Sequence, residues 1–141
     1  MKLGLITSIL GDMPFEKMVD FVSEAGLECI EVACWPPGDA ERRYAGVSHI
    51  DVDNMSPEYI AYIKDFCAKK GIEISSLAFY PNTMDGDLNK REANIAHLKK
   101  VINMSALLGV NMVTTFIGRD QTKTVEENLE LFKEIWPPII K

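Results

Sequence analysis

The chain repeats one short pattern three times: the end of an amphipathic helix, then a glycine, then a short apolar run. The glycines are Gly26, Gly71 and Gly109. Glycine readily adopts the left-handed conformation that ends a helix, and the runs behind these glycines are short and rich in β-branched residues, as strands are. Each repeat is therefore predicted to be the joint between a helix and a strand of a parallel sheet.

Helix starts lie between these joints. Pro14 and Pro57 stand where the first turns of two amphipathic segments begin, a position that proline tolerates well. Asn89 and Thr124 each precede a glutamate by three residues, which is the spacing of a capping box. We therefore expect helices to begin at these four places.

The apolar N-terminus, residues 1–10, is predicted to be a buried first strand. A signal peptide is the alternative, but Asp12 and Glu16 interrupt the apolar run and no small-residue cleavage site follows. No apolar run approaches the ~20 residues that a membrane span requires. The predicted order is a strand then a helix, four times, in one α/β domain over residues 1–141 whose parallel strands are covered by helices.

The loops distinguish an open doubly wound sheet from part of a closed barrel. The first strand-to-helix turn, residues 10–14, lacks the glycine-rich motifs of dinucleotide and nucleoside triphosphate sites. The two long loops, residues 35–55 and 80–88, both follow strands. They therefore lie at the carboxyl ends of the strands, where a barrel places its active site, and the barrel is favoured.

Charge and cysteine content exclude some classes of partner. A formal net charge of −6 disfavours nucleic acids and anionic membranes. The three cysteines are odd in number and widely spaced, which fits neither a disulfide framework nor a zinc knuckle. A cytoplasmic location is expected.

Three segments resemble the sugar phosphate isomerase/epimerase proteins of the xylose-isomerase-like TIM barrel superfamily. They are residues 43–51 after the second strand, Phe79–Asn82 at the third, and Thr115–Asp120 with the helix start at Thr124. The resemblance runs along nearly the whole chain and implies a (β/α)4 fold, the N-terminal half of a TIM barrel, because a complete barrel needs about 250 residues. In the family a fifth strand would follow Lys141.

The resemblance also implies a divalent metal of the Mn, Mg, Zn or Co type, which assists proton transfer next to a sugar carbonyl. In the family its ligands, two acidic residues, an aspartate and a histidine, come from the later strands. No metal ligand or catalytic residue can therefore be assigned in this chain, and no metal is expected to bind the chain alone. The superfamily also includes apurinic-site endonucleases, but their metal-binding histidines are missing from the third and fourth strand ends here. Nucleic acid is again disfavoured.

Four candidate substrate-binding residues lie in or after the second and third strands. Alternation places Glu31 with Cys29 on one face of a strand, where a carboxylate is costly unless paired. Glu31 is predicted to contact substrate or an ordering arginine, with a charge pair at the sheet surface as the alternative. Trp35 and Tyr80 are predicted to form an apolar wall for a sugar face, with the Asn82 amide binding a hydroxyl; the alternative is loop packing.

Three further side chains are weighed against structural roles. Arg119 is a candidate fork for a phosphate or carboxylate group, and its alternative is a salt bridge to Asp120 or Glu126. His49 is a candidate substrate-binding residue, although anchoring of its loop, which also holds Arg42 and Arg43, is favoured. The second of the two histidines, His97, lies in the middle of the third predicted helix and away from the strand ends, so it is expected to be structural.

Three hypotheses follow for the whole chain. It is the substrate-wall half of a sugar or sugar-phosphate isomerase/epimerase, or a catalytically inactive half-barrel that self-associates as a binding or structural module, or a piece of a longer enzyme. The expected partners are a small sugar or sugar phosphate, and either a second copy of the chain or a missing C-terminal half. Neither a nucleic acid nor a membrane is expected.

Overall fold

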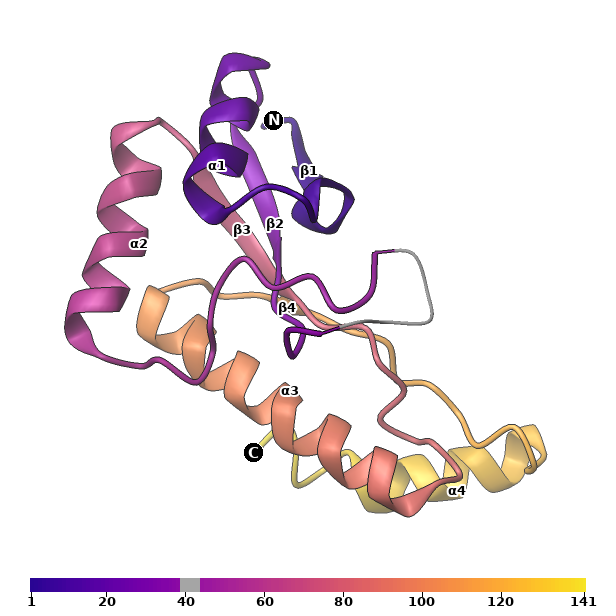
Figure 1. Cartoon of the computed structure of the whole chain (residues 1–141). Helices are drawn as coiled ribbons and strands as arrows, with labels where there is room; N and C mark the ends of the chain where they lie inside the picture. Colours follow the sequence, from indigo (N-terminus) through magenta and orange to yellow (C-terminus); the bar gives the residue numbers. More distant parts are fainter. Residues whose placement is uncertain (39–43) are drawn as a thin grey trace.

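A computed structural model describes residues 1–38 and 44–141 (Figure 1). Four parallel strands form one sheet in the order β1-β2-β3-β4, and helices alternate with them along the chain. The elements are β1 (Gly4–Ile6), the 3-10 helix η1 (Thr7–Leu10), α1 (Phe15–Glu24), β2 (Cys29–Ala33), α2 (Pro57–Lys69), β3 (Glu73–Ala78), α3 (Leu88–Leu108), β4 (Val113–Thr114) and α4 (Val125–Ile135). The predicted strand-then-helix order is confirmed.

The three glycine joints end α1, α2 and α3 in the same way. Gly26, Gly71 and Gly109 have φ angles of 75°, 70° and 75°. In each case the residue after the glycine donates its N–H to a carbonyl five residues earlier, at 3.1, 3.0 and 2.8 Å respectively. This is the Schellman ending, and it turns the chain back toward the sheet within a few residues. The glycine repeat therefore does what the sequence pattern predicts.

The core lies between the sheet and the helices. Ile30 and Val32 of β2 and Leu77 of β3 are fully buried, because alternate strand residues point toward the helices. They pack in one cluster with buried side chains from the helices, which include Met18, Val19, Val22, Ile63, Cys67, Leu98, Val101 and Met104. Figure 1 shows the helices following one another around the sheet in chain order. No helix in the described part of the chain is long and apolar enough to cross a bilayer.

The first strand is shorter than predicted, since β1 ends at Ile6 and η1 follows it. The prediction that it is buried was wrong, because Gly4 is exposed and Leu5 and Ile6 are only half-buried. The segment 47–49 takes the place of β1 beside the end of β2: the Trp35 N–H donates to the Val47 carbonyl at 3.1 Å, and the His49 N–H donates to the Ala33 carbonyl at 3.0 Å. Backbone groups of β2 that β1 would have bonded are thus satisfied by a loop. Local sequence carries no signal for such a return.

The structure agrees with three of the four predicted helix starts. The helix α1 begins at Phe15, directly after Pro14, and Ser56 caps α2 just before Pro57. Thr124 forms a complete capping box with Glu127. At α3 the prediction was wrong, because the cap is Asp87 and not Asn89. The Asp87 carboxylate accepts the N–H groups of Asn89 and Lys90 at 3.0 and 3.3 Å, so the helix starts earlier.

The last helix has an apolar side that nothing in the described part of the chain covers. Val125 is 65% exposed and Leu129 is 56% exposed, while Asn128 is the only buried residue within α4. An amphipathic helix usually buries its apolar face against the rest of its domain. This uncovered side of α4 marks a surface that the half-barrel leaves open.

A pair of leucine truncations tests this difference between helices. Leu98→Ala on α3 is expected to lower the free energy of unfolding by about 2–5 kcal/mol, because Leu98 is 1% exposed and its loss leaves a cavity. Leu129→Ala on α4 is the matched control, with an expected change of about 0.5 kcal/mol or less. Urea unfolding of both variants measures the two values. Equal losses would show that the apolar side of α4 is covered in solution.

Candidate functional site

Polar side chains gather on the inner face of the sheet, the face turned away from the helices. A β-bulge between β2 and β3 brings them together: Ile30 pairs with Ile74, but Glu31 pairs with Ser76, so Ser75 is an extra residue in β3. A bulge of this kind changes the direction in which the following side chains point. Ser76 therefore lies beside Glu31 on the inner face.

Glu31 is the centre of a hydrogen-bond network. The Ser76 hydroxyl donates to Glu31 Oε2 at 2.8 Å, and the Tyr80 hydroxyl donates to Glu31 Oε1. The same Tyr80 oxygen lies 3.2 Å from Thr114 Oγ1 of β4. Partial burial and the bond to Glu31 together raise the pKa of Tyr80 above its ordinary value of 10.0. Among the described residues two hydroxyl groups, and no arginine, bond to the Glu31 carboxylate, so its contact with substrate stays a prediction.

Three aromatic rings form what we call the aromatic wall: Trp35, Tyr80 and Phe116. The Tyr80 ring meets the Trp35 ring edge-on with centroids 5.6 Å apart, and it lies 4.7 Å from the Phe116 ring. Trp35 is 9% exposed, whereas Phe116 is 62% exposed. An exposed aromatic ring beside a polar network is typical of a surface that binds a ligand. Trp35 and Tyr80 are thus in contact with each other, and their role as a wall for a sugar stays a prediction.

Phe116 was missed by the sequence reasoning. It follows β4 by two residues, in the segment that carried the family resemblance, but its stacking partner Tyr80 is 36 positions away in the sequence. The only available signal was a large ring directly after a strand, at the end where sites form.

His49 anchors the loop after β2, as favoured from its position. Its Nε2 lies 3.1 Å from the Met13 carbonyl oxygen, and its Nδ1 lies 3.0 Å from the Thr7 hydroxyl. A carbonyl can only accept, so Nε2 carries the proton and Nδ1 accepts from Thr7. The Thr7 oxygen in turn accepts the Ala33 N–H at 2.9 Å. Both ring nitrogens are used, and a substrate-binding role for His49 is left without support.

Asn82 uses both atoms of its amide to hold two loops together. Its Nδ2 donates to the Arg119 carbonyl at 2.8 Å, and its Oδ1 accepts the Met84 N–H at 3.0 Å. Gly118 has a φ of 77°, and a Cβ placed there would lie 1.8 Å from Asn82 Oδ1. Glycine is therefore required for the two loops to meet. Hydroxyl recognition by Asn82 stays a prediction that this bonding does not favour.

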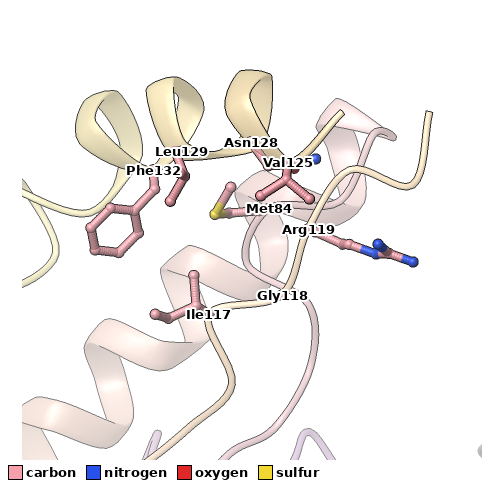
Figure 2. Close-up of a pocket in the computed structure, with 8 residues that line it drawn as sticks. All are labelled: Met84, Ile117, Gly118, Arg119, Val125, Asn128, Leu129 and Phe132. Carbon is pink, nitrogen blue, oxygen red and sulfur yellow. The ribbon is translucent and has the colours of Figure 1, made fainter. Parts of the chain in front are cut away.

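Arg119 is exposed, and its guanidinium points away from the neighbouring apolar side chains (Figure 2). It makes no ion pair with any described residue, so the predicted alternative, a salt bridge to Asp120 or Glu126, was wrong. Asp120 instead accepts the Thr122 hydroxyl at 2.7 Å and the Thr122 N–H at 3.0 Å. These bonds lower the pKa of Asp120 below its ordinary value of 3.8. Binding of an anion by Arg119 stays a prediction.

His97 lies closer to a strand end than expected. Its Nε2 donates to the Cys34 carbonyl at 2.7 Å, directly after β2, and its ring lies 4.6 Å from the Phe79 ring. The sequence placed His97 away from the strand ends because α3 was not located relative to β2. The contact comes from the helix side of the sheet, which fits the structural role expected of it.

The described residues offer no metal site. Residues 1–38 and 44–141 hold no group of three or more histidine, cysteine, aspartate or glutamate side chains that could bind an ion. Arg43, which carried part of the resemblance, and its neighbour Arg42 lie outside the described residues. The inner face offers a ligand hydrogen-bonding side chains and aromatic rings.

An apolar pocket of about 290 Å³ lies between α4 and the segment after β4 (Figure 2). It is lined by Met84, Ile117, Gly118, Arg119, Val125, Asn128, Leu129 and Phe132. Val125 and Leu129, the exposed apolar residues of α4, form one of its sides. The pocket thus continues the surface that α4 leaves open.

Replacing His49 by glutamine tests whether the ring is neutral in the folded chain. Burial lowers the pKa of His49 below its ordinary value of 6.5. Below that pH His49 binds a proton in the unfolded chain but stays neutral in the folded chain. The contribution of His49 to the free energy of unfolding is therefore fully present above about pH 6.5 and falls at lower pH, by up to about 1.4 kcal/mol per pH unit. Urea unfolding from about pH 7.5 to about pH 5 should show a steeper loss in the wild type than in His49→Gln. Identical slopes would rule out a neutral ring.

The chain is similar to known proteins in sequence and in fold. Residues 19–141 match the profile of a protein family described as xylose isomerase-like TIM barrel. The chain is also 26% identical over 148 residues to the uncharacterized protein YfiH of Bacillus subtilis strain 168. That match covers 100% of this chain and 44% of YfiH, so the chain spans less than half the length of this relative.

Solved structures show the same relation. A putative xylose isomerase from Rhodospirillum rubrum is similar with a TM-score of 0.70 and 17% identity, over 99% of this chain and 49% of that one. The probable 3-DHS dehydratase AsbF from Bacillus anthracis is similar with a TM-score of 0.66 and 17% identity, over 99% of this chain and 48% of that one. A sugar phosphate isomerase/epimerase from Parabacteroides distasonis is similar with a TM-score of 0.60 and 20% identity, over 98% of this chain and 46% of that one. The (β/α)4 half of a TIM barrel is thereby confirmed as the fold.

Proposed function

Because the chain belongs to the xylose isomerase-like TIM barrel family, we propose that it supplies the substrate wall of a sugar or sugar-phosphate isomerase or epimerase. The observation that carries the proposal is the aromatic wall beside the Glu31 network, at the carboxyl ends of β2, β3 and β4. This is the end of a TIM barrel where active sites lie. The apolar C–H face of a sugar packs on aromatic rings, and its hydroxyl groups require polar partners such as those around Glu31.

The metal and the proton-transferring groups of this proposal belong to barrel strands that this chain does not span. A divalent metal would supply Lewis acid chemistry at an oxygen of the sugar. The described residues of this chain bind and orient the sugar and shield one of its faces from water. One fold supports several reactions, and the similar structures include a probable dehydratase as well as an isomerase/epimerase, so the reaction itself is proposed only as this class.

The proposed location is the cytoplasm. Cys29, Cys34 and Cys67 are free thiols, which a reducing compartment preserves. Burial raises the pKa of Cys67 to about 11, and it raises the pKa of Cys34 further, so these two are inert side chains of the core.

Fluorescence of Trp35 tests the wall. In a Trp136→Phe background Trp35 is the only tryptophan, and D-fructose or fructose 6-phosphate is expected to change its emission with a saturable, roughly millimolar Kd. Tyr80→Ala should abolish the saturation, whereas Leu129→Ala, outside the wall, should preserve it. Absence of saturable binding by either sugar would contradict the proposal.

The same samples test where catalysis lies. With Mn²⁺ or Mg²⁺ added, the chain alone is expected to leave both sugars unconverted. Conversion at an ordinary enzymatic rate, about 10 s⁻¹, would show that this half holds catalytic residues after all.

A second candidate function is a half-barrel that assembles with a copy of itself as a binding or structural module. The observation that favours it is the apolar side of α4, where exposed Val125 and Leu129 border the pocket of about 290 Å³. Exposed apolar surface and open strand edges favour association between chains. Two half-barrels related by a twofold axis would cover both.

Light scattering distinguishes this second candidate. The wild type is expected to have the mass of a dimer at high concentration, and Leu129→Glu should shift it toward the monomer. Lys133→Glu adds the same side chain to α4 at a position already paired with Glu130 in solvent, so it should leave the mass unchanged. A wild type that stays monomeric would remove this candidate.

A further inference from the structure

We propose that Glu31 sets the hydrogen-bond polarity of Tyr80, so that the phenol oxygen meets a ligand only as an acceptor. The proposal rests on the proposed function, because it takes the inner face of the sheet to be a sugar-binding surface. It goes further in naming which part of a sugar this wall selects: a hydroxyl group rather than a carbonyl or phosphate oxygen. Glu31 then acts through Tyr80 and is a positioning residue.

The Tyr80 hydroxyl has a single proton, and Glu31 holds it. A tyrosine hydroxyl carries one proton, and a carboxylate can only accept. The structure directs the Tyr80 proton to Glu31 Oε1, and the Ser76 proton to Glu31 Oε2 at 2.8 Å. Tyr80 therefore has no proton left to donate to anything else.

The phenol oxygen also lies close to the hydroxyl group of Thr114. Thr114 Oγ1 lies 3.2 Å away, so the proton in that contact must come from Thr114. Thr114 has a competing acceptor in the Leu77 carbonyl, but at the longer distance of 3.4 Å. Whichever acceptor Thr114 uses, the Tyr80 proton is held by the carboxylate, and the phenol oxygen has lone pairs but no proton for a further partner.

Glu31 and Tyr80 are not sealed from a ligand. Both side chains are only partly buried. Glu31, but not Tyr80, also lines an open hollow of about 290 Å³ beside β1, together with Gly4, Leu5, Ile6, Cys29 and Ser75. The Tyr80 ring contacts both Trp35 and Phe116, so it cannot move away from the carboxylate without losing these contacts. A rigid acceptor in this place attracts a donor and opposes a second acceptor.

This polarity orients a sugar on the wall. A hydroxyl group can donate to Tyr80, whereas a carbonyl or phosphate oxygen offers only lone pairs and would face two other acceptors, the phenol and Glu31. A sugar on this face would therefore present hydroxyl groups to Tyr80 and direct its carbonyl or phosphate end away from β2 and β3. A site built for a hydroxyl group discriminates against an analogue that lacks the donor.

The test uses one variant that frees the phenol proton and one matched variant that does not. Glu31→Met has a similar length and no strong acceptor. Ser76→Ala removes the other bond to the carboxylate and keeps the bond from Tyr80. A chain labelled with ¹³C at the tyrosine ring carbon bearing the hydroxyl reports the ionisation of Tyr80, which is identified by the signal that Tyr80→Phe lacks.

Without ligand, the pKa of Tyr80 is expected to fall in Glu31→Met and to stay unchanged in Ser76→Ala, because only the first variant removes the acceptor that holds the phenol proton. With ligand, the Trp35 emission should report binding of D-fructose that weakens roughly tenfold when one particular hydroxyl is replaced by fluorine, an acceptor without a proton. In Glu31→Met this discrimination should disappear, since the freed phenol proton can meet fluorine or oxygen alike. Ser76→Ala should retain it.

The outcomes separate the two proposals. An unchanged Tyr80 pKa in Glu31→Met would overturn the polarity proposal without reference to any sugar. Equal binding of D-fructose and all of its singly fluorinated analogues by the wild type would also overturn it. A shifted Tyr80 pKa with no binding of any sugar would instead confirm the proton arrangement and remove the proposed function.

Discussion

A left-handed glycine at the end of each of the first three helices is the constraint on which the rest of this half-barrel depends. Gly26, Gly71 and Gly109 return the chain to the sheet at the same end each time, so every strand runs in the same direction. The carboxyl ends of the strands therefore meet along one edge. Trp35, Tyr80 and Phe116 come from three different strand ends, and the aromatic wall exists because these ends coincide.

What the sequence predicts well is local. The glycine joints, the capping box at Thr124 and the inward direction of Glu31 each depend on residues within one turn or one strand. What it missed depends on contacts between distant residues. The hydroxyl partners of Glu31 are 45 and 49 positions away, and the loop that shortens β1 reaches back from Val47. Phe116 was missed for the same reason, because nothing in the sequence around it indicates its contact with Tyr80.

Several candidate residues turned out to hold the framework that presents the wall. His49 and Thr7 tie the loop after β2 to the end of β1, and Asn82 ties the loop after β3 to the Arg119 carbonyl. Polar side chains in long loops are easily taken for ligand-binding groups, since both roles require hydrogen-bonding atoms near strand ends. The difference lies in whether those atoms are already satisfied. Glu31 and Tyr80 bond to each other and are both only partly buried, and Glu31 also lines an open hollow beside β1.

The bulge at Ser75 bears on how this strand can change in evolution. Side chains of a strand alternate between two faces, so the loss or gain of one residue normally exchanges the faces of all residues beyond it. Ser75 is the extra residue opposite β2, and Ile74 and Ser76 already face opposite ways. Residues 75 and 76 are both serine, so loss of either one gives the same sequence. One serine would then lie beside Glu31, and Leu77 would stay opposite Val32 in the core. The bulge makes this strand tolerant of a length change at one position, close to the proposed site.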